Sequence, residues 1–127
     1  MSIAHLTLAT RDVRATSEFF QRTFRWQPIR RPGNSPIEVE WLQIAPGQQL
    51  HVLKVEDFEP SPFEKEFGRH LALFHPGDDM EPLKDRLREA GAELLPPLRD
   101  TPFPRFFFRD PNGYMFEVID QNKYVIE

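Results

Sequence analysis

The chain contains no cysteine among its 127 residues, and this absence excludes disulfides, thiolate metal ligands and cysteine nucleophiles together. No apolar run approaches the roughly 18–20 residues that a membrane span needs, so we expect no membrane partner. The N-terminal stretch lacks a basic start and a small-residue cleavage site, which argues against a secretory signal. A cytoplasmic location is the expectation that remains.

The charge balance excludes a further class of partner. The chain carries 20 acidic and 16 basic residues, a net charge of −4, so it lacks the basic surface that a nucleic-acid backbone requires. The sequence also has no glycine-rich phosphate loop and no serine-centred nucleophile elbow. An apolar fraction of 39%, with 13% aromatic residues, is nevertheless sufficient for a compact core at this length.

The sequence repeats one succession of elements after about 65 residues. Alternation of apolar residues, helix caps and turn residues predicts the elements of each copy. The first copy comprises a strand over 3–9, a helix after Asp12, and a hairpin of strands 38–44 and 49–55. The second comprises a strand over 69–74, a helix over 80–90, a short edge strand over 93–95, and strands over 105–109 and 114–120.

The predicted fold class is therefore α+β, with two βαβββ modules whose curved mixed sheets form a cleft. We expect one domain over residues 1–127, made of a first module over 1–57 and a second over 68–121. A proline-containing linker over 58–67 joins them, and residues 122–127 form a tail. A four-stranded sheet with one helix leaves its other face open, so the modules are expected to pair, either within one chain or between two.

Four side chains suited to metal ligation occupy matching positions in the two copies. His5 matches His70 on the first strand of each copy, and His51 matches Glu117 on the last. Because side chains alternate along a strand, the leucines beside these residues point towards the helix and all four groups point to the opposite face. Three imidazoles and one carboxylate suit one divalent ion per site, whether Zn, Ni, Fe, Mn or Co.

Simpler roles are open for each residue taken alone. A histidine on a strand is more often a hydrogen-bonded structural residue, and Glu117 could pair with an arginine such as Arg105 or Arg109. His51 could be an acid/base group beside a metal triad rather than a ligand. His75, which precedes a Pro-Gly pair, is predicted to lie in a loop.

Candidate substrate contacts are less specific. Phe106 and Phe108 on one strand and Trp41 on another could line a pocket, although aromatic residues in strands usually belong to the core. Arg105 could hold an anionic group of a substrate, although a surface role is the simpler interpretation for any one arginine.

Several segments resemble the vicinal oxygen chelate superfamily, which includes glyoxalase I, extradiol dioxygenases, fosfomycin-resistance proteins and bleomycin-resistance proteins. The segments are His5-Leu6-Thr7-Leu8, the helix segment from Glu18 to Phe24, His70-Leu71-Ala72-Leu73, and the most specific, Asp110-Pro111-Asn112-Gly113-Tyr114-Met115-Phe116-Glu117-Val118. The resemblance implies that His5, His70 and Glu117 are metal ligands. It also implies paired βαβββ modules, often exchanged between the chains of a homodimer.

The expected function is that of a metal-dependent enzyme that chelates a small substrate through two adjacent oxygens. Glyoxalase- or lyase-like chemistry is favoured, with Glu117 or His51 as the catalytic group that moves a proton. Glyoxalase I usually has a carboxylate or amide where this chain has His51, which is a departure from that pattern. The alternatives are an extradiol-type dioxygenase acting on a catechol and a metal-free, bleomycin-resistance-like binding protein.

Overall fold

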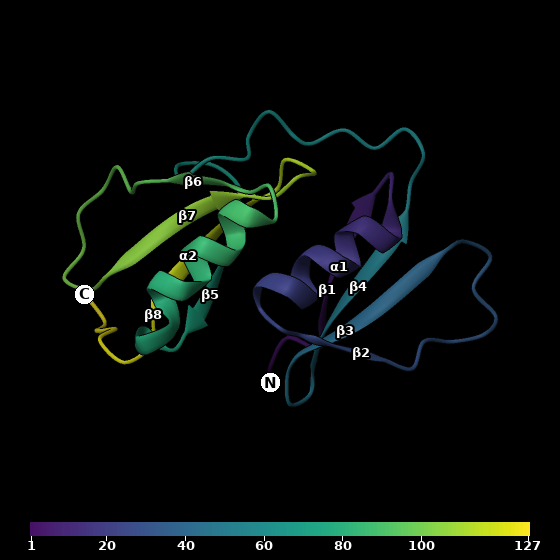
Figure 1. Ribbon diagram of the computed structural model, residues 1–127, viewed down its shortest axis with the longest axis horizontal. Coiled ribbons are helices and arrows are strands. Elements are labelled where there is room, and N and C mark those ends of the chain that lie inside the picture. The colour runs from purple at the N-terminus through teal and green to yellow at the C-terminus, as the bar shows by residue number, and fades with distance from the viewer. The chain divides into compact units, whose positions relative to one another are not determined.

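The computed structural model describes all residues from 1 to 127 and divides into two compact units, Met1–Phe58 and Glu59–Glu127. Each unit contains one four-stranded mixed sheet with one α-helix against it (Figure 1). The element order confirms the predicted α+β fold of two βαβββ modules. Neither helix has the length or the apolar character needed to span a bilayer.

The sheet of the first unit has the strand order β1-β4-β3-β2, with β1 parallel to β4 and the other neighbours antiparallel. Asp12 caps the helix as predicted, since its carboxylate accepts the backbone N–H of Ala15. Phe19 and Phe20 are buried against the sheet. The elements are β1 (His5–Thr10), α1 (Val13–Thr23), β2 (Gln27–Ile29), β3 (Val39–Ala45) and β4 (Gln48–Lys54).

The second unit repeats this topology with the order β5-β8-β7-β6. Its helix ends, as predicted, just before Gly91, which has a φ of 93° that L side chains rarely adopt. The elements are β5 (Leu71–His75), a 3-10 turn η1 (Gly77–Asp79), α2 (Met80–Glu89), β6 (Glu93–Leu95), β7 (Arg105–Arg109) and β8 (Met115–Asp120). The prediction for His75 is wrong, because this residue is the last of β5 rather than part of a loop.

In each sheet, one face packs on the helix and the other carries the candidate ligands. Leu8, Leu50 and Val52 of the first unit are fully buried, whereas Thr7 on the alternate face of β1 is exposed. In the second unit, Ala72 and Phe74 are exposed on the alternate face of β5. This two-residue alternation is the one that the sequence predicted.

The segment that leads into β5 is attached to the second unit through a buried glutamate. Glu64 is 3% exposed, and its Oε1 accepts a hydrogen bond from Nη1 of Arg69 at 2.8 Å and from the backbone N–H of Met115 at 2.7 Å. Pro60 lies so close to Gly113 that a Cβ added to this glycine would be 2.7 Å from the proline ring. The expected linker therefore packs on the β7–β8 side of this unit.

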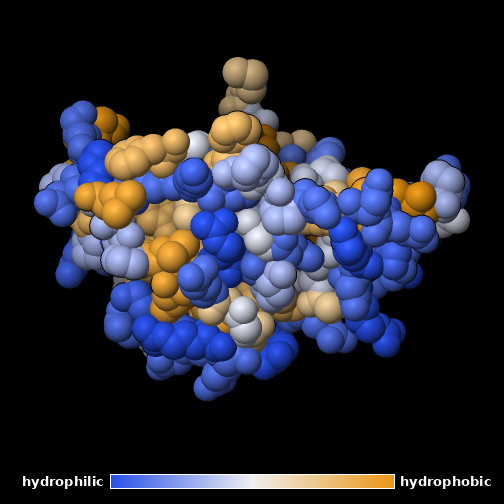
Figure 2. Space-filling view, turned by 90° about the horizontal axis from the view of Figure 1, so that it is seen from above, coloured by the Kyte–Doolittle hydropathy of each residue, from blue (hydrophilic) through white to orange (hydrophobic).

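The C-terminal residues return to the second sheet as well. The ring of Tyr124 lies 5.0 Å from that of Phe74 and 4.9 Å from that of Phe103. Glu127 pairs with Arg99 at 3.1 Å. Several apolar side chains of this unit stay exposed among the charged ones, and Figure 2 shows such apolar groups beside a largely hydrophilic surface.

Candidate functional site

In the first unit, the strand register brings two imidazoles and one indole together. His51 of β4 is paired with Thr7 of β1 on one side and with Trp41 of β3 on the other. His5 lies two residues before Thr7 and therefore on the same face. The His51 ring is stacked on both neighbours, with centroid distances of 4.0 Å to His5 and 3.9 Å to Trp41. The strand register thus brings two of the four candidate ligands, His5 and His51, into contact.

The surroundings of His51 favour its neutral form. Burial lowers the pKa of His51, and the neighbouring His5 lowers it further. Nε2 of the ring lies 2.8 Å from Oε1 of Gln49, and a donated hydrogen bond there leaves the lone pair on Nδ1. Neutral imidazole is the form that binds metal ions and accepts protons.

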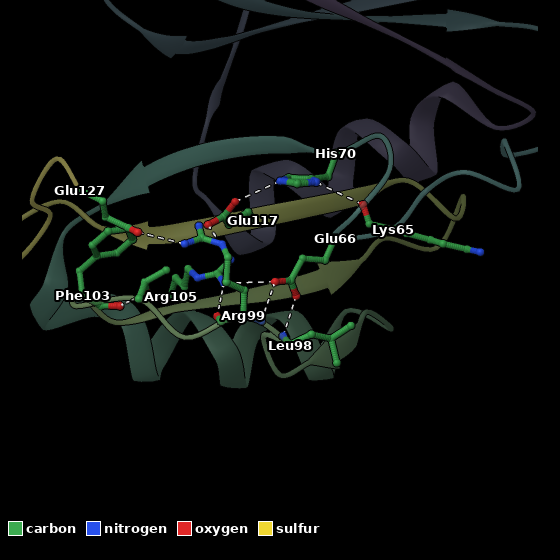
Figure 3. Close-up of polar contacts among 10 residues, drawn as sticks. Lys65, Glu66, His70, Leu98, Arg99, Phe103, Arg105, Glu117 and Glu127 are labelled. Carbon is green, nitrogen blue, oxygen red and sulfur yellow. Dashed lines mark hydrogen bonds and ion pairs between the residues drawn. The ribbon is translucent and has the colours of Figure 1, made fainter.

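In the second unit, the carboxylate of Glu117 on β8 lies between His70 and Arg105 (Figure 3). It is paired with Ala72 of β5 and with Phe107 of β7. Oε1 of Glu117 lies 3.1 Å from Nε2 of His70, and Oε2 accepts a hydrogen bond from Nη1 of Arg105 at 3.1 Å. Two of the four candidate ligands, His70 and Glu117, thus lie together, and Glu117 also pairs with Arg105, one of the two arginines offered as its partner if it were not a ligand.

The contacts of His70 determine where its ring carries a proton. Nδ1 lies 3.2 Å from the backbone oxygen of Lys65, which can only accept a hydrogen bond, so Nδ1 must donate. In the neutral ring, the lone pair of Nε2 then faces a carboxylate oxygen of Glu117. Two acceptors in this position repel each other unless a second proton or a cation lies with them.

Arg105 connects this pair to a second buried carboxylate. Its side chain is 3% exposed, and Nη2 contacts Oε2 of Glu66 at 3.2 Å and the backbone oxygen of Arg99. Glu66 also accepts the backbone N–H groups of Leu98 at 2.7 Å and Arg99 at 3.0 Å. Burial alone would raise the pKa of Glu66, but these N–H groups and Arg105 lower it below its ordinary value. Glu66 was not among the predicted site residues, because it lies in a segment with the composition of a linker.

Of the four candidate substrate residues, two lie on the helix side of their sheet and two lie beside candidate ligands. Phe106 and Phe108 lie on the face of the sheet that packs on α2, since Nζ of Lys84 is 5.1 Å from the Phe106 ring and Phe108 stacks on Phe116. The aromatic ring beside Glu117 is instead Phe107, which is 5.1 Å from the His70 ring. This corrects the choice of Phe106 and Phe108, whereas Trp41 and Arg105 do contact candidate ligands.

Each unit brings its candidate ligands together as a pair, and the structure contains no group of three or more His, Asp or Glu side chains arranged to hold a metal ion. The chemistry of the donors fits a divalent cation nonetheless. Burial lowers the pKa of His51, Nε2 of His70 lies beside a carboxylate, and a backbone carbonyl contacts the other nitrogen of His70, as is usual for metal-binding histidines.

The sequence model of the Glyoxalase/Bleomycin resistance protein/Dioxygenase superfamily matches residues 2–118 of this chain. The chain belongs to this superfamily. Its members are the vicinal oxygen chelate proteins, and the match covers both units and all four candidate ligands.

Individual members of the superfamily are more distant. The chain is 26% identical over 123 residues to Glyoxylase I 4 of Arabidopsis thaliana. The aligned region covers 92% of this chain and 69% of the plant protein. Among solved structures, the fosfomycin resistance protein FosX of Listeria monocytogenes superposes with a TM-score of 0.75 at 19% identity, covering 100% of this chain and 94% of FosX. FosX of Mesorhizobium loti gives a TM-score of 0.73 at 17% identity, covering 93% and 90%. At these identities the structural likeness supports the fold.

Proposed function

We propose that this chain is a metal-dependent enzyme that binds a small substrate through two adjacent oxygens, with glyoxalase- or lyase-like chemistry. The candidate ligands of its divalent cation are His5, His51, His70 and Glu117. The observation that carries this proposal is the contact between His70 and Glu117. Nδ1 of His70 contacts the backbone oxygen of Lys65 at 3.2 Å, and Nε2 lies 3.1 Å from Oε1 of Glu117, so one nitrogen and one carboxylate oxygen face each other where a cation could be shared.

Membership of the superfamily supports a cation at these residues. One structure of Listeria monocytogenes FosX, a glutamate-to-glutamine variant, contains Mn(II) and 1S,2S-dihydroxypropylphosphonic acid; it superposes with a TM-score of 0.79 at 19% identity, covering 94% of this chain and 91% of FosX. That ligand carries hydroxyl groups on adjacent carbons. A substrate with two neighbouring oxygens is therefore the class we propose for this chain.

The residues of the chain divide the chemistry between them. When bound, the cation would supply Lewis-acid stabilisation of negative charge that develops on a substrate oxygen. Glu117 would carry a proton taken from the substrate only if its Oε1, which Arg105 does not contact, were not occupied by the cation. Nδ1 of His51 could accept the proton instead if His51 is not a ligand. Trp41 and Phe107 flank these groups with apolar surface that limits access of water.

Metal analysis of the purified protein tests the proposal. After reconstitution with Mn(II), Zn(II) or Ni(II), wild type should retain about one equivalent, since a site of three or four ligands fills readily. Glu117→Gln should lose most of it. Less than about a tenth of an equivalent in wild type would contradict the proposal and favour the metal-free alternative.

The metal-free alternative has an observation of its own. Glu117, Arg105 and Glu66 form a connected ion-pair network, and a protonated His70 would complete it without any cation. In that case the chain would bind a small hydrophobic ligand, as we expect of a bleomycin-resistance-like protein. The absence of retained metal in wild type would separate this function from catalysis.

The extradiol alternative depends on His51. The ring of His51 is held between His5 and Trp41 and is bonded to Gln49, a setting that also suits a group beside a three-ligand site. Three ligands would leave room for both a catechol and dioxygen. Retention of Fe(II) with oxygen uptake on catechols, and full occupancy in His51→Ala, would favour this chemistry over the lyase-like one.

We also propose a homodimer in which ligands of one chain complete the site of the other. Wild type should then have the mass of a dimer by light scattering. His5→Ala and His70→Ala should each fail to bind Mn(II) alone, and a subunit-exchanged mixture should regain binding. If the mixture still fails to bind Mn(II), all ligands of a site come from one chain.

A further inference from the structure

Arg105 is a buried arginine whose two terminal nitrogens contact different carboxylates. Nη1 donates to Oε2 of Glu117 at 3.1 Å, and Nη2 donates to Oε2 of Glu66 at 3.2 Å. The guanidinium also lies over the ring of Phe107, with 5.2 Å between its central carbon and the ring centroid. Burying an arginine is costly unless carboxylates pair with it, and here two of them do.

The position that matches Arg105 in the first unit is occupied by an apolar residue. Arg105 lies two residues before Phe107, the partner of Glu117 in the β7–β8 ladder. Val39 lies two residues before Trp41, the partner of His51 in the β3–β4 ladder. Where the candidate ligand is an imidazole, this position is apolar. Where the ligand is a carboxylate, it is an arginine.

The contacts of Arg105 distinguish the two oxygens of Glu117. Nη1 of Arg105 occupies Oε2, while Nη2 is held by Glu66 on the other branch of the guanidinium. Oε1 of Glu117 is left facing Nε2 of His70 at 3.1 Å.

We infer that Arg105 is a positioning residue for metal ligation, which holds Oε2 of Glu117 so that this carboxylate presents Oε1 alone to a cation. Glu66 in turn positions Arg105, because it accepts a hydrogen bond from Nη2 of Arg105. The backbone N–H groups of Leu98 and Arg99 hold the carboxylate of Glu66 in place. This inference rests on the proposed function, since it assigns how the second unit presents its ligand. Arg105 is therefore not a free anchor for an anionic group of the substrate.

Competition of the folded protein with a fluorescent chelator for Mn(II) tests this role. Arg105→Met should weaken Mn(II) binding on the order of 10- to 100-fold, the usual effect of removing a group that orients a ligand. Arg105→Lys should recover only part of the loss, because an ammonium cannot hold two carboxylates in a fixed fork. Arg109→Gln is the matched control, because Arg109 lies on the same face of β7 and contacts Glu93 and two backbone oxygens instead of Glu117.

Glu66→Gln separates positioning from a general loss of structure. Glu66 does not contact Glu117, so its substitution should weaken Mn(II) binding in wild type and have no further effect in Arg105→Met. If Arg105→Met does not fold, the same comparison is made in Arg105→Lys, where the effect of Glu66→Gln should shrink. Circular dichroism verifies that each variant is folded.

The outcomes distinguish this inference from the function on which it rests. A wild type that binds none of Mn(II), Zn(II) and Ni(II) contradicts the proposed function. A wild type that binds Mn(II), with equal losses in Arg105→Met and Arg109→Gln, overturns the role of Arg105 alone. Fully additive effects of Glu66→Gln and Arg105→Met also overturn it.

Discussion

The indole ring of Trp41 lies parallel to the imidazole ring of His51, with 3.9 Å between the centroids and 4° between the planes. Because β4 lies between β1 and β3, His5 stacks on the other side of the same imidazole at 4.0 Å. This arrangement fixes the plane of the His51 ring and hence the direction of its lone pair. It also places an intrinsic fluorophore against a candidate ligand.

Trp41 should therefore report metal binding. Ni(II) or Co(II) should quench the tryptophan fluorescence of wild type, and Trp41→Phe should lose most of this quenching. Trp26→Phe should retain it, because Trp26 stacks on Phe20 and Phe24 instead. Fluorescence titration measures both variants. Quenching that persists in Trp41→Phe and disappears in Trp26→Phe would place the ion away from His51.

Asp79 should make folding sensitive to acid. Arg86 holds the pKa of Asp79 at about 2, against an ordinary value of 3.8, with His75 as a second partner. A depressed pKa gives stability that is present above pH 3.8 and lost as the pH falls towards 2. Asp79→Asn should destabilise by about 1 kcal/mol at pH 7, a modest effect because Asp79 is partly exposed.

Urea unfolding of Asp79→Asn and wild type between pH 7 and pH 2 measures this effect. The difference in unfolding free energy should close as the pH falls below about 4. Asp78→Asn is the control, because Asp78 is exposed and should show no such closing. A difference that stays constant over the whole range would contradict the assigned role of the Asp79–Arg86 pair.

Asp110 should have the opposite pH dependence. Burial raises the pKa of Asp110 to about 6. The backbone N–H groups of Tyr114 and Asn112 donate hydrogen bonds to Oδ1 and act in the opposite direction, but Oδ2 is buried with no hydrogen-bond partner. A raised pKa gives stability that is complete below pH 3.8 and is lost as the pH rises through 6.

Asp110→Asn removes this titration and keeps an oxygen that can accept the two N–H groups. Between pH 4 and pH 8, wild type should lose on the order of 1–3 kcal/mol relative to Asp110→Asn. Urea unfolding at each pH gives the two slopes, which matter more than the absolute stabilities because the amide adds a buried donor. Parallel slopes would show that Asp110 does not titrate in this range.

The fold could be predicted largely from local patterns. Two-residue alternation located β1 and β4 and the faces on which His5 and His51 lie. Asp12 and Gly91 marked helix ends because caps depend on nearby backbone groups. The same local logic missed His75, since a following Pro-Gly pair resembles the start of a loop while strand pairing with Asp120 extends β5 by one residue.

The surroundings of the candidate site were harder to predict. Glu64 and Glu66 lie in a segment rich in proline and acid, which has the composition of an exposed linker. Their burial depends on partners far along the chain, Met115 for Glu64 and Leu98, Arg99 and Arg105 for Glu66. Periodicity carries no information about such contacts. Phe107 was missed for a related reason. In a run of three phenylalanines, the residue types alone do not tell which ring lies on the same face as Glu117, and only the register of β7 against β8 does.

Isothermal titration of Mn(II) into His5→Ala and His70→Ala tests the proposed metal site most directly. These variants remove one candidate ligand from each unit. We expect wild type to bind about one equivalent and each variant to lose affinity by more than the roughly 10- to 100-fold that a neighbouring group costs. Binding at wild-type affinity in either variant would contradict the proposed metal site.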